Sequence, residues 1–341
     1  MIRFFAHPQV RSNRASVGRA PPQCSSGEGL FAVNGNGAKY VLASETVGRP
    51  LFNGWKYVAA WILLLFAQGC ASVPYRYGPL PAGAPSLPLR PGESQIERGR
   101  PNALIDGVGW VVGIPSKIIL WNIRMDNHRI SPDTEQALQT YLQRNRLDTV
   151  KVRLNQYAPG GEWSRLFRNK SVGRGWRYTL GLLSCAFYTL LPQRIFGGDN
   201  YNAYTDTISL YSDVPAVSLH EGGHAKDFAS RTWKGTYAFA YALPFFALYP
   251  EALATGDAVG YLRDQPDVKA EKKSYHTLYP AYGTYIGGSF SQYLIPYTWV
   301  YYAGVIPGHI AGRWKSTTVE ARRAREPHEE TPVPVPPPSS P

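Results

Sequence analysis

The sequence predicts one mainly helical domain that contains a small β-sheet. Two observations favour this fold class. Apolar runs of helical length recur through residues 102–326, and only two short segments, 150–155 and 207–211, have the pattern of strands. The chain has 341 residues, 44% of them hydrophobic, which is enough to bury a sizeable core. Its 3 cysteines are too few for a disulfide scaffold, so the domain must rely on that core.

The charge of the chain does not indicate a nucleic-acid partner. The formal net charge is +12, and +5 of it falls in residues 1–69, which hold seven basic and two acidic residues. The remaining +7 is spread over the rest of the chain without a basic stripe or a nucleic-acid motif. We therefore expect no nucleic-acid binding.

The N-terminal part has the pattern of a secretory signal peptide. An uncharged apolar run of 11 residues, 57–67, follows Lys56 and is followed by small residues. Such a run is too short to span a bilayer, which takes about 20 residues. The segment that ends at Cys70, Ala-Gln-Gly-Cys, resembles a bacterial lipobox, which implies that Cys70 becomes the lipidated first residue. The alternative is a buried strand or helix with an incidental cysteine.

These patterns divide the chain into five predicted regions. They are an extension that fits no signal peptide (1–46), the lipoprotein signal peptide (47–69), a proline-rich tether (70–101), the folded domain (102–326) and a disordered proline-rich tail (327–341). No aspartate follows Cys70, which by the same resemblance implies the periplasmic face of the outer membrane. Cys185 lies in an apolar run and is expected to be a small buried hydrophobe.

The first half of the domain contains an apolar segment, a helix and a strand. Segment 103–121 is apolar but interrupted by glycines and a proline, and we expect it either to be buried or to insert into a membrane surface. Ser131, followed by a proline and acidic residues, predicts a helix that runs to about Asn145. Valine and leucine alternate with charged residues over 150–155, which predicts a half-exposed strand.

The second half alternates apolar helices with a turn and a strand. Residues 176–191 predict an apolar helix, 197–200 a turn and 207–211 a second strand. Ser212 and Asp213, just before Pro215, predict the start of the next helix.

Two later apolar segments, 236–249 and 289–312, are interrupted by prolines. We expect core helices there that also touch a membrane surface, with true membrane spans as the alternative.

The most specific motif is His220-Glu221-Gly222-Gly223-His224. On a helix, residues four apart share a face, so both imidazoles can hold one zinc ion. Glu221 would then lie beside the open position of the metal and take a proton from the metal-bound water. Glycines are poor helix formers, so their presence indicates close approach of another chain or of a substrate strand. The alternative is two surface histidines on a helix.

A zinc site needs a third protein ligand. Pro250 starts a helix on which Glu251 follows His224 by 27 residues, enough for the chain to return to the metal. Asp257 is the alternative ligand or an acceptor that orients a ligand histidine. The other interpretation of Glu251 is a carboxylate that interacts with the helix dipole.

These segments resemble the gluzincin metallopeptidases, in particular the group of the bacterial heat-shock membrane metallopeptidase and the prenyl-protein protease. The resemblance covers about 60 residues: Asn202-Ala203-Tyr204, the strand 207–211, the motif 220–224 and the Glu251 helix. It implies an α+β, zincin-like fold in which a strand presents its edge to an extended substrate. The family has a bulky apolar residue at the position of Gly222, and its third-ligand segment reads Glu-Xaa-Xaa-Ala-Asp.

A peptidase also needs a group that stabilises the developing oxyanion. The candidates downstream of the motif are Tyr275, His276, Tyr282 and His309. For each of them, packing within the aromatic core is the alternative role.

The leading hypothesis is therefore a zinc-dependent endopeptidase of the cell envelope, anchored through Cys70 and acting on a peptide or protein substrate. One alternative is a non-enzymatic envelope lipoprotein with a degenerate metal site. The other is an intramembrane metalloprotease, although charged residues follow the motif directly at 226, 227 and 231.

Overall fold

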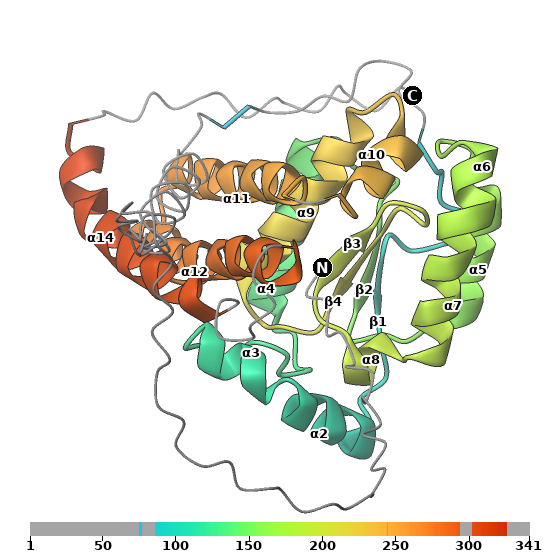
Figure 1. The fold of residues 1–341 in the computed structure, drawn as a ribbon, viewed down its shortest axis with the longest axis horizontal. Coiled ribbons are helices and arrows are strands. Elements are labelled where there is room, and N and C mark those ends of the chain that lie inside the picture. The colour runs from blue at the N-terminus through green and yellow to red at the C-terminus, as the bar shows by residue number, and fades with distance from the viewer. Residues whose placement is uncertain (1–74, 77–85, 244, 294–301, 326–341) are drawn as a thin grey trace, which may run out of the picture. The chain divides into compact units, whose positions relative to one another are not determined.

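The protein is described by a computed structural model that covers residues 75–76, 86–243, 245–293 and 302–325 (Figure 1). The predictions for the N-terminal extension, the signal peptide, Cys70 and the tail at 327–341 lie outside these residues.

The described chain is mainly helical and contains a small sheet. The strands are β1 (Ile96–Arg98), β2 (Lys151–Leu154), β3 (Asn200–Asn202) and β4 (Thr207–Leu210). The helices are α2 (Ala103–Val112), α3 (Ile114–Ile119), α4 (Pro132–Arg144), α5 (Pro159–Arg168), α6 (Arg174–Trp176), the π-helical segment η1 (Arg177–Gly181), α7 (Leu182–Leu190), α8 (Gln193–Phe196), α9 (Pro215–Ala229), α10 (Lys234–Ala240), α11 (Leu248–Arg263), α12 (Val268–Tyr293) and α14 (Val305–Arg323).

The sheet has the strand order β1-β2-β4-β3. The pairs β1–β2 and β2–β4 are parallel, and β3 runs antiparallel to β4 at the edge. Val152 of β2 pairs with Ile96 on one side and with Ile208 on the other. The prediction of a mainly helical α+β fold with a small sheet is confirmed.

Strand β2 is buried at all four positions, so the expectation of a half-exposed strand is wrong. Its two basic side chains are covered by ion pairs instead of solvent. Lys151 Nζ lies 2.5 Å from Glu97 Oε1, and Arg153 Nε lies 2.8 Å from Glu162 Oε1. Paired charges can be buried at positions where alternation alone predicts exposure.

The fold begins before the predicted boundary at residue 102. Leu87 is buried, β1 adds to the sheet, and the Gly99 N–H donates to Leu154 O at 2.8 Å. The C-terminal end of the predicted tether is therefore part of the domain. Likewise, Asn200 begins strand β3 at the end of the predicted turn.

Helix α4 begins as predicted, because Ser131 is its N-cap and accepts a hydrogen bond from the Thr134 N–H. The cap of α9 differs from the expectation. Its N-cap is Val214, without a side-chain hydrogen bond. The Asp213 carboxylate instead accepts hydrogen bonds at 2.6 Å from the hydroxyls of Ser131 and Thr134, and so joins the starts of α4 and α9.

Asp213→Asn is expected to lower the free energy of unfolding by about 2 kcal/mol at pH 7, because hydrogen bonds to a charged group are lost. Burial acts to raise the pKa of Asp213, but the hydrogen bonds from Ser131, Thr134 and Arg124 lower it below the usual value. The stabilisation that the Asp213 carboxylate gives to the fold is thus complete above the unfolded-state pKa of about 3.9. It is lost as the pH falls through the folded-state pKa. Urea unfolding of both proteins from pH 7 to pH 2 checks this. A difference that stays constant down to pH 2 contradicts it.

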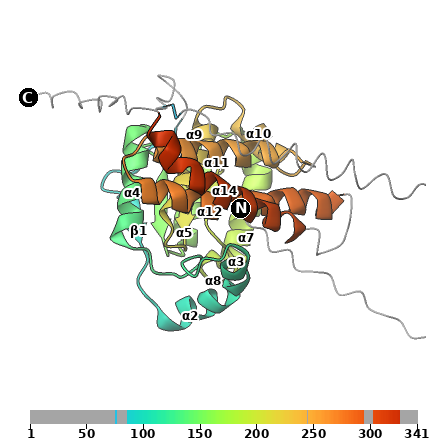
Figure 2. The same cartoon turned by 90° about the vertical axis from the view of Figure 1, so that its left-hand side faces the viewer.

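Helix α9 lies at the centre of the domain (Figures 1 and 2). It packs against α4, α11 and α12 and also contacts β3 and β4. The apolar segments at 236–249 and 289–312 contribute to α10, α11, α12 and α14. Of the helices in the described ranges, none combines the length and the apolar character that a membrane crossing requires.

Candidate metal centre

The motif residues lie in the middle of α9, where the helix is buried on every side. His220, Glu221 and His224 are 8%, 3% and 4% exposed. Pro215 at the first turn starts the helix, and the predicted strand before it is β4. The His-Glu-Xaa-Xaa-His segment therefore has the predicted helical geometry, with both imidazoles on one face.

Helix α11 brings Glu251 to these two histidines. His220 Nε2 lies 3.1 Å from His224 Nε2 and 3.1 Å from Glu251 Oε2, and His224 Nε2 lies 3.3 Å from the same carboxylate oxygen. Of all described histidines, cysteines and acidic residues, these three form the one group with the spacing of metal ligands. The third residue is the glutamate predicted from the sequence.

The donor set fits a zinc ion. Two imidazole nitrogens and one carboxylate oxygen are a common zinc ligand set, and ligand atoms about 2.0–2.1 Å from a tetrahedral ion lie about 3.3 Å apart. The carboxylate of Glu251 is also held in its ionised form without a metal. Burial acts to raise the pKa of Glu251, but the charge of His224 and hydrogen bonds from both histidines hold it well below its usual value.

Each histidine also has an oxygen partner at its second ring nitrogen. Thr255 Oγ1 lies 3.3 Å from His220 Nδ1, and Tyr241 Oη lies 3.3 Å from His224 Nδ1. With Nε2 turned toward a metal, Nδ1 carries the proton and donates to these oxygens, which orients both rings. Sequence reasoning missed both partners. The signal for Thr255 was its position four residues after Glu251, on the same face of α11.

Thr255→Val is expected to weaken zinc binding about 10- to 100-fold, because the Nδ1–H of His220 loses its acceptor while the side-chain volume is kept. Thr255→Ser keeps the hydroxyl and should bind zinc as the wild type does. Competition with a fluorescent chelator measures both affinities. Equal affinities of the valine variant and the wild type would contradict this role.

Glu221 has a buried carboxylate oxygen, Oε2, that finds no hydrogen-bond partner within the described part of the chain. Asp199 lies near enough that the charge of Glu221 helps burial to raise the pKa of Asp199. A buried oxygen without a protein partner is costly unless water or a ligand satisfies it. Glu221 is thus placed to bond a molecule other than the protein.

The structure places Asp257 away from the cluster. It accepts a hydrogen bond from the Tyr141 hydroxyl, and Lys226 Nζ lies 2.5 Å from its Oδ1. Six residues after Glu251, its side chain leaves α11 in a different direction. Asp257 therefore joins α11 to α4 and α9 and does not contact either histidine.

The oxyanion candidates also have partners elsewhere. His276 bonds Ser316 at 2.8 Å, and His309 bonds the carbonyl of Ile119 at 2.8 Å. The hydroxyls of the two tyrosines donate to neighbouring groups, from Tyr275 to Glu271 Oε1 at 3.1 Å and from Tyr282 to Leu248 O at 3.2 Å. None of these four contacts involves His220, His224 or Glu251.

The two glycines of the motif allow close packing within the protein. A Cβ on Gly222 would lie 2.7 Å from the Tyr141 ring, and one on Gly223 would lie 3.0 Å from the Ala254 backbone. The expectation of another chain or a substrate strand at these glycines is therefore wrong, because α4 and α11 of the same chain occupy the space. Tyr141 fills the space that a bulky residue at position 222 would take.

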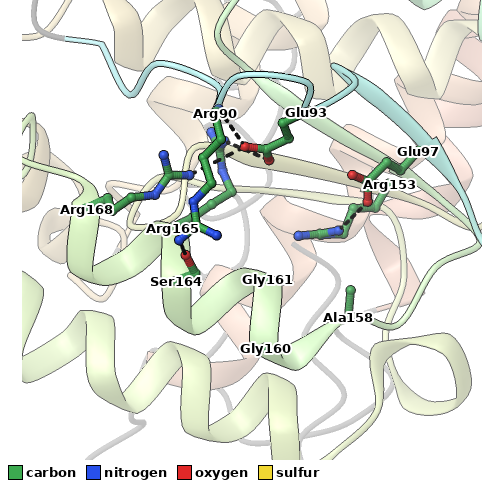
Figure 3. Close-up of a pocket in the computed structure, with 10 residues that line it drawn as sticks. All are labelled: Arg90, Glu93, Glu97, Arg153, Ala158, Gly160, Gly161, Ser164, Arg165 and Arg168. Atoms are coloured by element: carbon green, nitrogen blue, oxygen red, sulfur yellow. Dashed lines mark hydrogen bonds and ion pairs between the residues drawn. The ribbon is translucent and has the colours of Figure 1, made fainter.

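A separate cavity of about 380 Å³ lies between the segment before β1 and helix α5 (Figure 3). It is lined by Arg90, Glu93, Glu97, Arg153, Ala158, Gly160, Gly161, Ser164, Arg165 and Arg168. In Figure 3 the Glu93 carboxylate points toward Arg165 and Arg168, and Glu97 lies beside Arg153. The Glu93 pairs hold the segment before β1 on α5, the Glu97 pair joins β1 to β2, and none of His220, His224 and Glu251 lines this cavity.

Comparison with known proteins identifies no similar protein. No family model, no curated protein and no solved structure matches the chain.

Proposed function

We propose that the protein is a zinc-dependent peptidase. The observation that carries the proposal is the convergence of His220, His224 and Glu251 at 3.1–3.3 Å, with a buried Glu221 oxygen that has no hydrogen-bond partner among the described residues. A structural zinc site is closed by four protein ligands, whereas a catalytic site has three and an open position. The described residues supply three.

The roles of the side chains follow from their positions. His220, His224 and Glu251 would hold the metal, while Thr255 and Tyr241 keep the imidazoles in the correct orientation. Bound zinc supplies a lowered pKa for water, near 7, and polarises the scissile carbonyl. Glu221 accepts the proton of the attacking water and donates it to the nitrogen of the leaving amine, so that the peptide C–N bond breaks while a C–O bond forms.

Three features support assignment to the zincin-like, gluzincin type. The metal ligands come from two helices, one with the His-Glu-Xaa-Xaa-His motif and one with a glutamate. The segment Glu251-Ala-Leu-Ala-Thr255 keeps the spacing of Glu-Xaa-Xaa-Ala-Asp, with the threonine hydroxyl in place of the aspartate carboxylate. Strand β3 is the sheet edge next to α9, where an extended peptide would add as a further strand.

Metal removal tests this function. Treatment of the purified chain with a chelator is expected to abolish cleavage of a broad peptide library, and added zinc should restore it. His224→Ala should be inactive with or without zinc, because one ligand is missing. Glu320→Gln, on the exposed side of α14, is the control and should behave as the wild type. Cleavage that survives complete zinc removal would contradict the proposal.

The expected location in the cell envelope rests on the segment that ends at Cys70, which lies outside the described residues. Incorporation of labelled palmitate into the wild type, but not into Cys70→Ser, would support it. Equal labelling of both proteins would contradict it.

A further inference from the structure

Helices α2 and α3 present a continuous apolar stripe to the outside of the protein. The residues of this stripe, called the apolar ridge below, are Leu104, Val108, Val111, Ile114, Ile118 and Trp121. The first three lie on one face of α2, Ile114 and Ile118 lie on one face of α3, and Trp121 follows the end of α3. Exposed fractions reach 77% at Leu104 and 66% at both Ile118 and Trp121.

The buried positions of α3 are polar. Ser116 and Lys117 are 5% and 7% exposed. The Lys117 ammonium donates to the backbone carbonyls of Trp110 at 3.0 Å and Asp126 at 3.2 Å, and the Ser116 hydroxyl donates to Gly113 O at 2.8 Å. A helix on the surface of a water-soluble domain normally turns its apolar stripe toward the core. The exposed apolar stripe on α2 and α3 therefore marks a surface that meets a membrane or another protein.

The neighbouring helix α14 also exposes apolar side chains. Ile306, Ile310 and Trp314 are each about two-thirds exposed, whereas Gly308 and His309 are buried. The His309 ring stacks on Trp121 with centroids 4.1 Å apart, and its Nε2 bonds Ile119 O. This contact fixes the end of the ridge on the body of the domain. In Figures 1 and 2, α2 and α3 lie together at the same side of the domain, toward the bottom of both views.

The charges beside the ridge favour one occupant. Exposed basic residues flank it along the chain at Arg100 and Arg129, and the partly exposed Arg124 is paired with Asp213. Of the two acidic residues in this part of the chain, Asp106 is paired with Arg194 and Asp126 is buried, where its pKa is raised to about 7. Two copies of this face would bring like charges together, whereas anionic lipid headgroups would complement the arginines.

We propose that the apolar ridge lies in the surface of an anionic lipid bilayer, with α2 and α3 parallel to the membrane plane. The two helices together are too short to cross a bilayer, but their apolar side chains match the depth of the boundary between headgroups and acyl chains. Trp121 at the end of the ridge is a residue type enriched at this boundary. The contact is independent of Cys70 and of the metal centre.

A site-specific dye tests the proposal in the full chain. Cys24→Ser and Cys70→Ser remove two thiols, and Cys185 stays unlabelled because it is buried and its thiol pKa is raised to about 12. Ile118→Cys or Leu104→Cys then carries an environment-sensitive dye on the ridge. Gln139→Cys on the exposed side of α4 is the matched control.

Vesicles of phosphatidylethanolamine and phosphatidylglycerol are expected to shift the emission of the ridge dyes to the blue and to leave the Gln139→Cys dye unchanged. Vesicles of phosphatidylcholine should give a smaller shift. Ridge dyes that stay unshifted while the protein sediments with vesicles would overturn the proposal, since binding would then occur elsewhere. A shift that needs no vesicles and grows with protein concentration would identify a second copy as the occupant and overturn it as well. Equal shifts with both lipids would show that anionic headgroups are not required, which would overturn that part of the proposal.

Discussion

Glu221→Gln is expected to lower kcat for peptide hydrolysis by about 10³-fold while the chain keeps its zinc. The glutamine side chain has the same shape, but it cannot accept the proton of the attacking water. In the proposed site His220, His224 and Glu251 hold the metal, so the variant should bind zinc with unchanged affinity. Initial rates on a defined peptide, measured with zinc content on the same samples, check both parts.

Two comparisons make this result specific. Glu135→Gln replaces a partly exposed glutamate that pairs with Arg98 on the surface, and it should leave kcat unchanged. A Glu221→Gln protein that is folded, holds zinc and cleaves at the wild-type rate would rule out a proton-transfer role for Glu221. A variant that has lost its zinc would instead make Glu221 a part of the metal site.

Gly223→Val is expected to give the largest combined loss of stability and metal binding. A Cβ at this position already lies 3.0 Å from both Cα and O of Ala254, so the valine methyl groups must push α11 away from α9. Ala254 is three residues from Glu251, and the carboxylate should move with the helix. We expect the free energy of unfolding to fall by about 1–3 kcal/mol and zinc affinity to fall by about tenfold or more.

Gly107→Val is the matched control for this substitution. Gly107 is also in a helix, but a Cβ there would have no neighbour within 4 Å. Its cost should be limited to helix propensity, a few tenths of a kcal/mol in either direction, with unchanged zinc affinity. Urea unfolding and chelator competition measure both variants. Equal effects at the two positions would contradict a packing role for Gly223.

Much of the site could be predicted because its chemistry depends on spacing along helices. The motif at 220–224 specifies two imidazoles on one face, and Pro250 indicates a helix that carries Glu251. Helix α4 could be predicted equally well, because its N-cap, Ser131, is next to it in the sequence. Signals of this kind depend only on neighbouring residues, so the sequence alone is enough to recognise them.

Features that depend on distant partners could not be predicted. Strands β1 and β3 have only three residues each and are specified by the neighbouring strands more than by their own pattern. Lys151 in β2 is buried because Glu97 reaches it from another strand. Tyr241, directly after α10, contacts His224 because the chain folds back after α9. The spacing of these two residues along the sequence does not predict that contact.

The zinc content of the purified full chain, determined by elemental mass spectrometry beside His224→Ala, tests the central claim most directly. The account predicts about one zinc per wild-type chain and none in the variant, with both proteins folded by circular dichroism. A folded wild type without zinc, or equal zinc in both proteins, would contradict a metal centre at His220, His224 and Glu251.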